Sequence, residues 1–278
     1  MLSRSSRIGR CRQVVGQFWL TVQLDGYAVL LDDFFVAPPS ISKTGLFETH
    51  PTGIDAVLHG DNAHEGNFFR LAAQQPDALN ELRRTATLLL GSEDCAKLFK
   101  IYELSNDLDR QELTWRLHQF PEDVRFYLHS DELQRAWPDS AFYHLSAPSP
   151  FSTSAWPKES FHTLDLLYVS TTRRIVRHDK ETDGQVFGNF DKFLAAEGMA
   201  AHLRVGQEMR NAWLNFICGQ EAWQGCFDES TVTFGIDGMV QRRFEQCRDW
   251  PSKRRQRLRD LQMLGVDRVT QICTVLYP

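Results

Sequence analysis

The sequence predicts a mixed α/β protein, and three stretches carry this prediction. Ala56–Gly60 is a short apolar run that ends in glycine, as a buried strand does. The stretch Asn67–Trp137 has leucines at roughly helical spacing, and Ala141–Leu145 is a second strand candidate. Strands that alternate with helices along one chain are typical of α/β folds.

Local signals divide the helical stretch into separate helices. Gly91 is placed to end one helix, and Ser92 is placed to cap the next one. Pro121 and Pro138 are expected to interrupt the helical pattern, because proline removes a backbone donor. We therefore expect several short helices between the two strands.

The flanking parts of the chain are less regular. Before the first strand, a basic segment 1–17 is expected to be disordered, and Asp25-Gly26 predicts a turn between apolar runs within 18–31. Pro38-Pro39 then breaks the chain ahead of a short helical stretch. After the second strand we expect a Pro- and Ser-rich loop over 146–157, a short helix after Phe161, a polar loop over 171–188, a helix over 209–218, a strand pair over 234–243 and a basic helix over 251–264.

Composition limits the function classes. The chain has 278 residues, a net charge of -5 and no run near the roughly 20 apolar residues that span a bilayer. The charge gives no general attraction to nucleic acid or to anionic membranes. The six cysteines form no Cys-x-x-Cys pair, so a zinc ribbon has little support. Localisation and oligomeric state are not indicated.

Glu65 and His162 are the candidate catalytic residues. Glu65 lies in the polar loop 61–66 after the first strand, where a carboxylate can hold a histidine in one tautomer. His162 follows the second strand and is a residue type suited to general-base catalysis. Taken alone, each is more often an ordinary polar residue. Gly66, beside the acid, is expected to allow a tight and otherwise strained backbone conformation.

Two alternatives use neighbouring residues. His50, His59, His64 and Glu65 are metal-ligand types, but their spacing fits neither a helical His-Glu-x-x-His motif nor a zinc finger, so we expect no metal. The basic stretch 241–264 is conceivable as a nucleic-acid surface. A solvated helix face is the better interpretation, because few aromatic residues are interleaved with its charges.

A serine nucleophile would complete an ester-hydrolysing triad. Such a serine works best in a Gly-x-Ser-x-Gly turn beside an oxyanion hole. None of the seventeen glycines frames such a serine, and no His-Gly-Gly-Gly segment occurs.

Several stretches in order resemble the type-B carboxylesterase family, which includes cholinesterases and fungal lipases. The segment 57–69 resembles the family's strand, short loop, Asp-Glu-Gly and aromatics, with His64 where aspartate is usual. The segment 161–166 resembles its His-x-x-acid motif. Supporting likenesses lie at Leu24-Asp25-Gly26, 123–126, 141–145, 208–223 and 233–239.

The resemblance implies an α/β-hydrolase fold, of which 18–278 would be the C-terminal portion, with an incomplete sheet and flanking helices. It implies that Glu65 is the triad acid and His162 the triad histidine, with Gly66 and Asp165 in support. The substrate would be a small-molecule or lipid ester, and no cofactor would be needed. The nucleophile would lie outside this chain, which would be inactive alone. The alternative is a catalytically dead hydrolase-like binding module.

Overall fold

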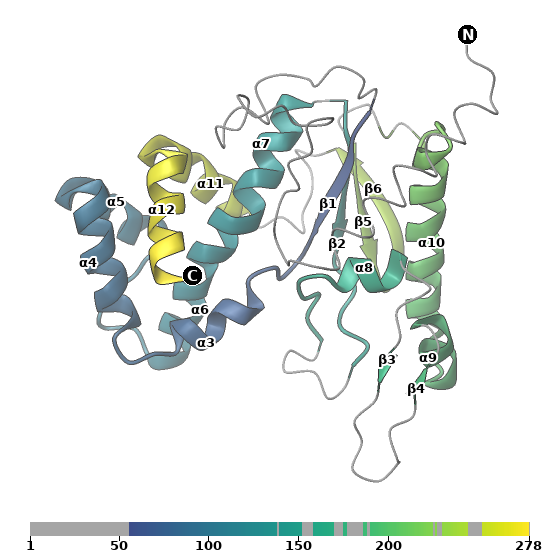
Figure 1. Cartoon of the computed structure of the whole chain (residues 1–278), viewed down its shortest axis with the longest axis horizontal. Helices are drawn as coiled ribbons and strands as arrows, with labels where there is room; N and C mark the ends of the chain where they lie inside the picture. Colours follow the sequence, from purple (N-terminus) through teal and green to yellow (C-terminus); the bar gives the residue numbers. More distant parts are fainter. Residues whose placement is uncertain are drawn as a thin grey trace.

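The computed structural model describes residues 56–137, 139–151, 158–169, 175–176, 186–187, 190–224, 226, 230–243 and 252–277. Its centre is a sheet with helices on both faces (Figure 1). The sheet has the order β1-β2-β5-β6, in which β1, β2 and β5 are parallel and β6 is antiparallel to β5. The strands are β1 (Leu58–Asn62), β2 (Ala141–Leu145), β5 (Ser230–Gly235) and β6 (Gly238–Arg243). The mixed α/β class is therefore confirmed.

The strands of this sheet follow the sequence pattern, but β1 and β5 differ from it in their bounds. β2 has the predicted bounds, and the predicted C-terminal strand pair is present as β5 and β6. β1 begins at Leu58 and includes Asp61 and Asn62, which were expected in a loop. The reason is tertiary, because Asp61 pairs with His144 of β2 and Asn62 pairs with Leu145. Pairing with a neighbouring strand overrides the local loop preference of polar residues.

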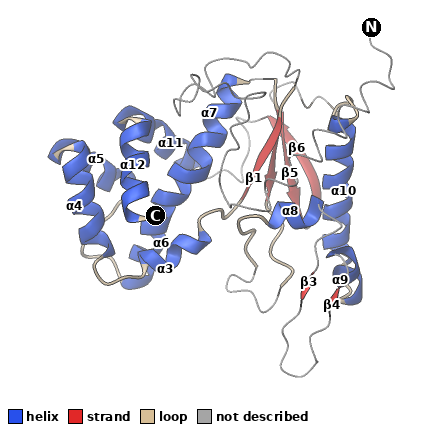
Figure 2. Ribbon diagram, viewed as in Figure 1, coloured by secondary structure: helices blue, strands red, loops and turns tan. Residues whose placement is uncertain are grey.

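Strand β2 separates two hydrophobic cores. Its five residues are all buried, as expected for a strand covered on both faces. Alternate side chains point to opposite faces, so Phe142 packs into one core while Tyr143 and Leu145 pack into the other. Helices therefore cover both sides of the sheet, as Figure 2 shows.

The first core lies between the sheet and the larger helical layer. Helix α6 (Arg110–Glu122) continues without a break into η3 (Asp123–Tyr127) and α7 (Leu128–Ala136). The part η3 is a π turn, and it begins two residues after Pro121, which was expected to interrupt the helical pattern. A π turn is a common way to fit one extra residue into a helix, and it often marks a functional site. This layer comprises η2 (Asn67–Phe69), α3 (Arg70–Ala73), α4 (Ala78–Leu90), α5 (Ser92–Ile101), α6 (Arg110–Glu122), η3 (Asp123–Tyr127), α7 (Leu128–Ala136), α11 (Ser252–Leu264) and α12 (Val266–Leu276).

The junction between α4 and α5 corrects one expectation. Gly91 has φ 83°, a conformation that glycine adopts without strain, and its N–H bonds to the Thr87 carbonyl at 3.0 Å. Ser92 is the first residue of α5 rather than its cap, and no side chain caps this helix. The glycine alone therefore both ends α4 and begins α5.

The second core lies on the other face of the sheet. It is covered by α8 (Leu164–Val169), α9 (Phe190–Ala196) and α10 (Ala200–Ile217). Helix α10 begins nine residues before the predicted amphipathic stretch 209–218 and ends at Ile217, one residue before the predicted end. Two short paired strands, β3 (Ile175–Val176) and β4 (Val186–Phe187), lie within the stretch expected to be a polar loop.

The predicted basic segment 1–17, the turn at Asp25-Gly26, the Pro38-Pro39 break and the helical stretch after it lie outside the described residues. The division of the chain at residue 18 stays a prediction. No helix within the described ranges is long and apolar enough to cross a bilayer.

Candidate functional site

Glu65 and His162 lie side by side at the carboxyl ends of β1 and β2. His64 and Phe161 form a parallel bridge, which places the next residue of each segment against the other. Oε2 of Glu65 is 2.5 Å from Nδ1 of His162. The expected hydrogen bond is therefore present, and the residues meet where α/β folds usually hold their chemistry.

The two side chains have different surroundings. The side chain of Glu65 is 7% exposed and that of His162 is 23% exposed. Burial raises the pKa of the Glu65 carboxyl above its usual range, although the hydrogen bond with His162 acts in the opposite direction. The acid is thus enclosed, and the histidine lies nearer the surface.

The conformation of His162 is restrained by rings and by backbone strain. Its imidazole packs against Phe126 and Phe68, with ring centroids 4.9 and 5.8 Å away. The next residue, Thr163, has φ 68°. A β-branched residue in this left-handed region costs roughly 1–3 kcal/mol, and such strain is concentrated at functional sites.

Asn62 connects the acid to Asp165. Its backbone N–H and its side-chain amide both donate to Oε1 of Glu65, at 2.7 and 3.0 Å. The same amide donates to Oδ1 of Asp165 at 3.1 Å, and the Asp165 N–H donates back to Oδ1 of Asn62. Tyr143 donates its hydroxyl proton to Oδ2 of Asp165 at 2.9 Å, and burial raises the pKa of this tyrosine, so the proton stays. Asp165 therefore holds the histidine segment in place through Asn62.

Gly66 is required for a reason that differs from the expected one. Its φ is -91°, which other residues adopt, so the backbone is not strained there. A β-carbon at this position would lie 2.4 Å from Cβ of Glu122. Close approach of helix α6, rather than an unusual conformation, excludes a side chain.

The opposite face of the acid segment borders a cluster of buried charges. Asp61 accepts a hydrogen bond from His144 within the sheet, and both side chains are almost completely buried. Asp123 pairs with Arg257 at 2.6 Å and lies 3.7 Å from Arg254. The expected solvated face of the basic helix is thus wrong for these two arginines, which point inward.

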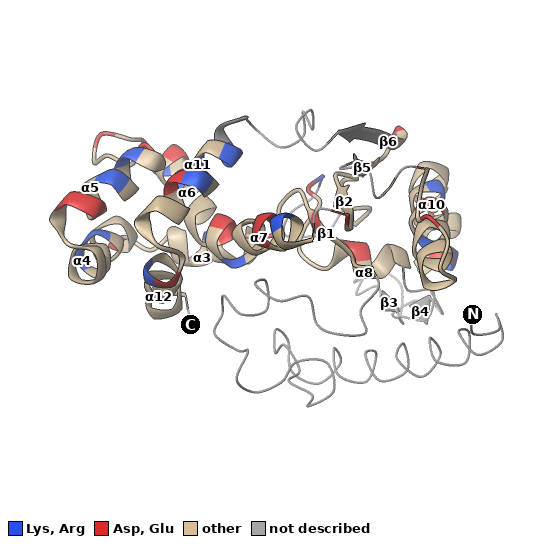
Figure 3. Cartoon of the chain, turned by 90° about the horizontal axis from the view of Figure 1, so that it is seen from above, with Lys and Arg blue, Asp and Glu red and all other residues tan. Residues whose placement is uncertain are grey.

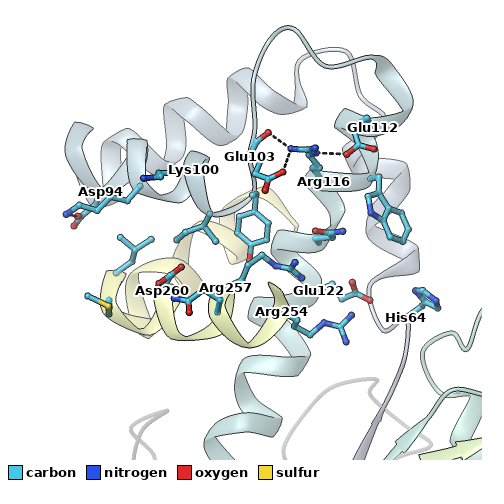
Figure 4. A pocket seen from close by; sticks show the side chains of 18 of the residues that line it. His64, Asp94, Lys100, Glu103, Glu112, Arg116, Glu122, Arg254, Arg257 and Asp260 are labelled. Atoms are coloured by element: carbon cyan, nitrogen blue, oxygen red, sulfur yellow. Dashed lines mark hydrogen bonds and ion pairs between the residues drawn. The ribbon is translucent and has the colours of Figure 1, made fainter. Parts of the chain in front are cut away.

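A pocket of about 900 Å³ opens beside this cluster, lined by parts of α5, α6 and α11. Figure 4 shows Glu122 and Arg254 next to each other at the end of the pocket near His64. Arg116 is paired there with Glu103 and Glu112. Positions of both charge signs occur along the surrounding helices (Figure 3).

His59, another of the metal-ligand candidates, is bound to polar side chains away from the Glu65–His162 pair. His59 is 3.1 Å from Gln134 and 3.2 Å from Ser140, and burial lowers its pKa to about 4. His50 lies outside the described residues. Within the part of the chain that the structure describes, no three His, Cys, Asp or Glu side chains are arranged to hold a metal.

Sequence reasoning missed four residues of the site. Asn62 and Tyr143 bind the acid and Asp165, while Glu122 and Tyr127 contact the acid segment from beneath. An available signal was the polar pair Asp61-Asn62 at the end of an apolar strand. The tyrosines gave no signal, because an isolated aromatic residue in a helix or strand is usually part of the core.

Comparison with known proteins identifies no relative. No protein-family model matches the chain, and no curated protein sequence is significantly similar to it. The geometry of the site is therefore the basis for assigning a function.

Proposed function

We propose that this chain supplies the acid and the general base of a carboxylic-ester hydrolase. The single observation that carries the proposal is the 2.5 Å contact between Oε2 of Glu65 and Nδ1 of His162. With Nδ1 held by a carboxylate, Nε2 is the ring atom suited to take a proton from a nucleophile. This geometry is that of the acid–histidine part of a hydrolytic triad.

The surrounding structure supports the same proposal. The acid precedes the histidine along the chain, and each follows a parallel strand, which is the chain order of α/β hydrolases. We propose that β1, β2 and β5 are the last parallel strands of such a sheet and that the segment 18–278 is the C-terminal portion of a type-B carboxylesterase-like domain. The strained Thr163 and the Asn62–Asp165 hydrogen bonds would fix the histidine segment.

In the proposed reaction, Nε2 of His162 takes the proton of a nucleophilic hydroxyl as that oxygen attacks the ester carbonyl. Glu65 stabilises the resulting imidazolium through Nδ1, and His162 then returns the proton to the leaving alcohol. Water repeats the sequence on the acyl intermediate. The chain contains no Gly-x-Ser-x-Gly turn, so we propose that the nucleophile comes from a segment N-terminal to this sequence.

A hydrolase-like binding module without activity is the second candidate, and the lack of a serine turn favours it. The two candidates differ in the reading frame that precedes the Met1 codon. An in-frame Gly-x-Ser-x-Gly turn there supports the enzyme.

The longest product of that reading frame provides the decisive experiment. We expect it to hydrolyse p-nitrophenyl esters and to react with a fluorophosphonate at one serine. The variant His162→Asn should lose both activities, and Glu65→Gln should lose about 10³- to 10⁴-fold in kcat. The control His129→Asn, at a histidine on α7 whose side chain is 36% exposed, should keep both.

Absence of turnover and labelling in that product would overturn the hydrolase proposal. Labelling of a serine within these 278 residues that depends on His162 would instead overturn the external nucleophile.

A further inference from the structure

The segment 62–66 rests on two buried side chains of the α6-η3-α7 helix. The hydroxyl of Tyr127 lies 2.8 Å from the carbonyl oxygen of Asn62 and 2.9 Å from that of Ala63. Oε1 of Glu122 accepts a hydrogen bond from the Gly66 N–H at 3.1 Å. These hydrogen bonds hold the backbone in place before and after Glu65.

The π turn brings the two side chains together. Glu122 and Tyr127 are five residues apart, a spacing at which side chains on an α-helix diverge. In a π turn, hydrogen bonds connect residues i and i+5. The Tyr127 hydroxyl consequently lies 3.3 Å from Oε1 of Glu122, and both groups face the same loop.

Several acceptors surround the Tyr127 hydroxyl, whose oxygen also accepts a hydrogen bond from the Glu65 N–H at 3.5 Å. The Tyr127 hydroxyl carries one proton, yet the carbonyls of Asn62 and Ala63 and the Glu122 carboxylate all lie within reach of it. A proton on Glu122 adds a second donor. Glu122 can then donate to the tyrosine oxygen, while the tyrosine donates to a carbonyl.

Burial favours a proton on Glu122, and the neighbouring charges act on this carboxyl in both directions. Arg254 of α11 lies over the Tyr127 ring at 3.8 Å and attracts the ionised carboxylate. Arg257 is taken up by Asp123, and His64 lines the same pocket end. Asp123 of η3 and Glu65 of the loop are carboxylates that disfavour the ionised form of Glu122, and Asp61 of β1 acts in the same direction on Tyr127. Burial raises the pKa of Glu122 to about 7.

We propose that Glu122 and Tyr127 are positioning residues for Glu65 and that they share a proton beneath the segment 62–66. Ionisation of Glu122 favours opening of this segment, because opening returns the carboxylate to water. The catalytic meaning rests on the proposed hydrolase function. The positioning itself can be measured in the chain without any ester.

Hydrogen exchange of the Glu65 and Gly66 amides is the first test. In Tyr127→Phe both amides should exchange at least tenfold faster, and the Nδ1 proton of His162 that bonds Glu65 should leave its downfield NMR position. Tyr102→Phe is the matched control, since Tyr102 is equally buried and donates to Asp123 at 3.1 Å. Loss of a buried hydroxyl by itself would destabilise the core in both variants. Only Tyr127→Phe should speed up exchange of the Glu65 and Gly66 amides.

The pH dependence is the second test. After correction for intrinsic exchange rates, wild-type protection of the Gly66 amide should fall about tenfold between pH 6 and 8. The reason is that the Glu122 carboxyl has a pKa near 7 in the closed state and its lower, ordinary pKa in the open state, so a rise in pH favours opening. Glu122→Gln keeps an acceptor for Gly66 and gains a permanent donor. Its protection should not change over this range.

Equal exchange in the Tyr127→Phe and Tyr102→Phe variants, or a pH dependence that persists in Glu122→Gln, would overturn the proposal. In the longer hydrolase, Tyr127→Phe should lower kcat about tenfold or more with KM unchanged. Normal kcat in an active Tyr127→Phe enzyme would refute the positioning role. A wild-type protein without turnover would refute the hydrolase function, and the exchange rates of the Glu65 and Gly66 amides would then decide whether Glu122 and Tyr127 position the segment 62–66.

Discussion

Asn62 and Asp165 are joined by two reciprocal hydrogen bonds, one from the Asn62 amide at 3.1 Å and one from the Asp165 N–H at 3.3 Å. They connect the end of β1 to the start of α8, 103 residues away in the chain. The same amide also donates to Glu65. Asn62 is therefore the donor that allows two carboxylates to lie close together.

Replacement of the Asn62 side-chain amide should lower the free energy of unfolding. Asn62→Asp places a third carboxylate between Glu65 and Asp165 with almost no change in shape. We expect a loss of more than about 3 kcal/mol in unfolding free energy at pH 8, measured by urea denaturation, because buried like charges lose their compensating hydrogen bonds. The loss should shrink at pH 5, where a shared proton is available. Asn80→Asp, on the exposed face of α4, should change stability by less than about 0.5 kcal/mol.

Gly66→Ala should destabilise the fold by about 1–3 kcal/mol, since its β-carbon would overlap Cβ of Glu122. Thermal unfolding measures the effect. Gly206→Ala in α10 is the control, because the nearest atom there is the flexible end of Arg210. An unchanged Tm for Gly66→Ala would mean that α6 does not lie this close to the acid segment.

Arg257→Met should destabilise by about 1–3 kcal/mol, because the fully buried Asp123 loses its hydrogen-bonded cation and keeps only the more distant Arg254 and the Tyr102 hydroxyl. Arg259→Ala, an exposed position on the same helix, should be neutral within about 0.5 kcal/mol. Chemical denaturation of both variants distinguishes an inward-facing α11 from a solvated one. Similar small effects in the two would contradict the buried ion pair.

Stability should fall in acid because of His118. Burial lowers the pKa of this fully buried histidine to about 3, while the unfolded chain titrates near 6.5. The contribution of neutral His118 to the free energy of unfolding is fully present above pH 6.5. It is lost as the pH falls toward 3, and the total loss is up to roughly 5 kcal/mol. His118→Leu should therefore flatten the stability profile between pH 6.5 and 4, and His129→Leu should not. A parallel decline in all three proteins would assign the acid sensitivity to other groups.

Local pattern predicted the parts of the fold that local interactions determine. Strand β2 and the β5–β6 pair were expected from local pattern. The pairing of Glu65 with His162 was expected only from the family resemblance, because it joins residues 97 positions apart. The catalytic role of the pair stays a prediction. The extension of β1 through Asn62 was missed, because it depends on pairing with residues more than 80 positions away.

The burial of charged residues could not be predicted from local sequence pattern, again because it depends on residues far apart in the chain. Arg257 resembles any other basic residue of a polar helix until Asp123, 134 residues earlier in the chain, is brought against it. Pro121 predicted a helix end, but the π turn allows the helix to continue to Ala136. In each case the local signal was correct in kind, and a distant contact decided the outcome.

The sequence separation of the contacts at the site affects the order in which the protein can fold. The helix that carries Glu122 and Tyr127 touches the Glu65 segment across 56 to 65 intervening positions, and His162 reaches it across 97. Contacts of such long sequence separation form late, because the loops between them must first close. No short fragment of the chain can contain a preformed site. Nascent chains should therefore acquire a structured acid loop only after both helical layers have docked on the sheet.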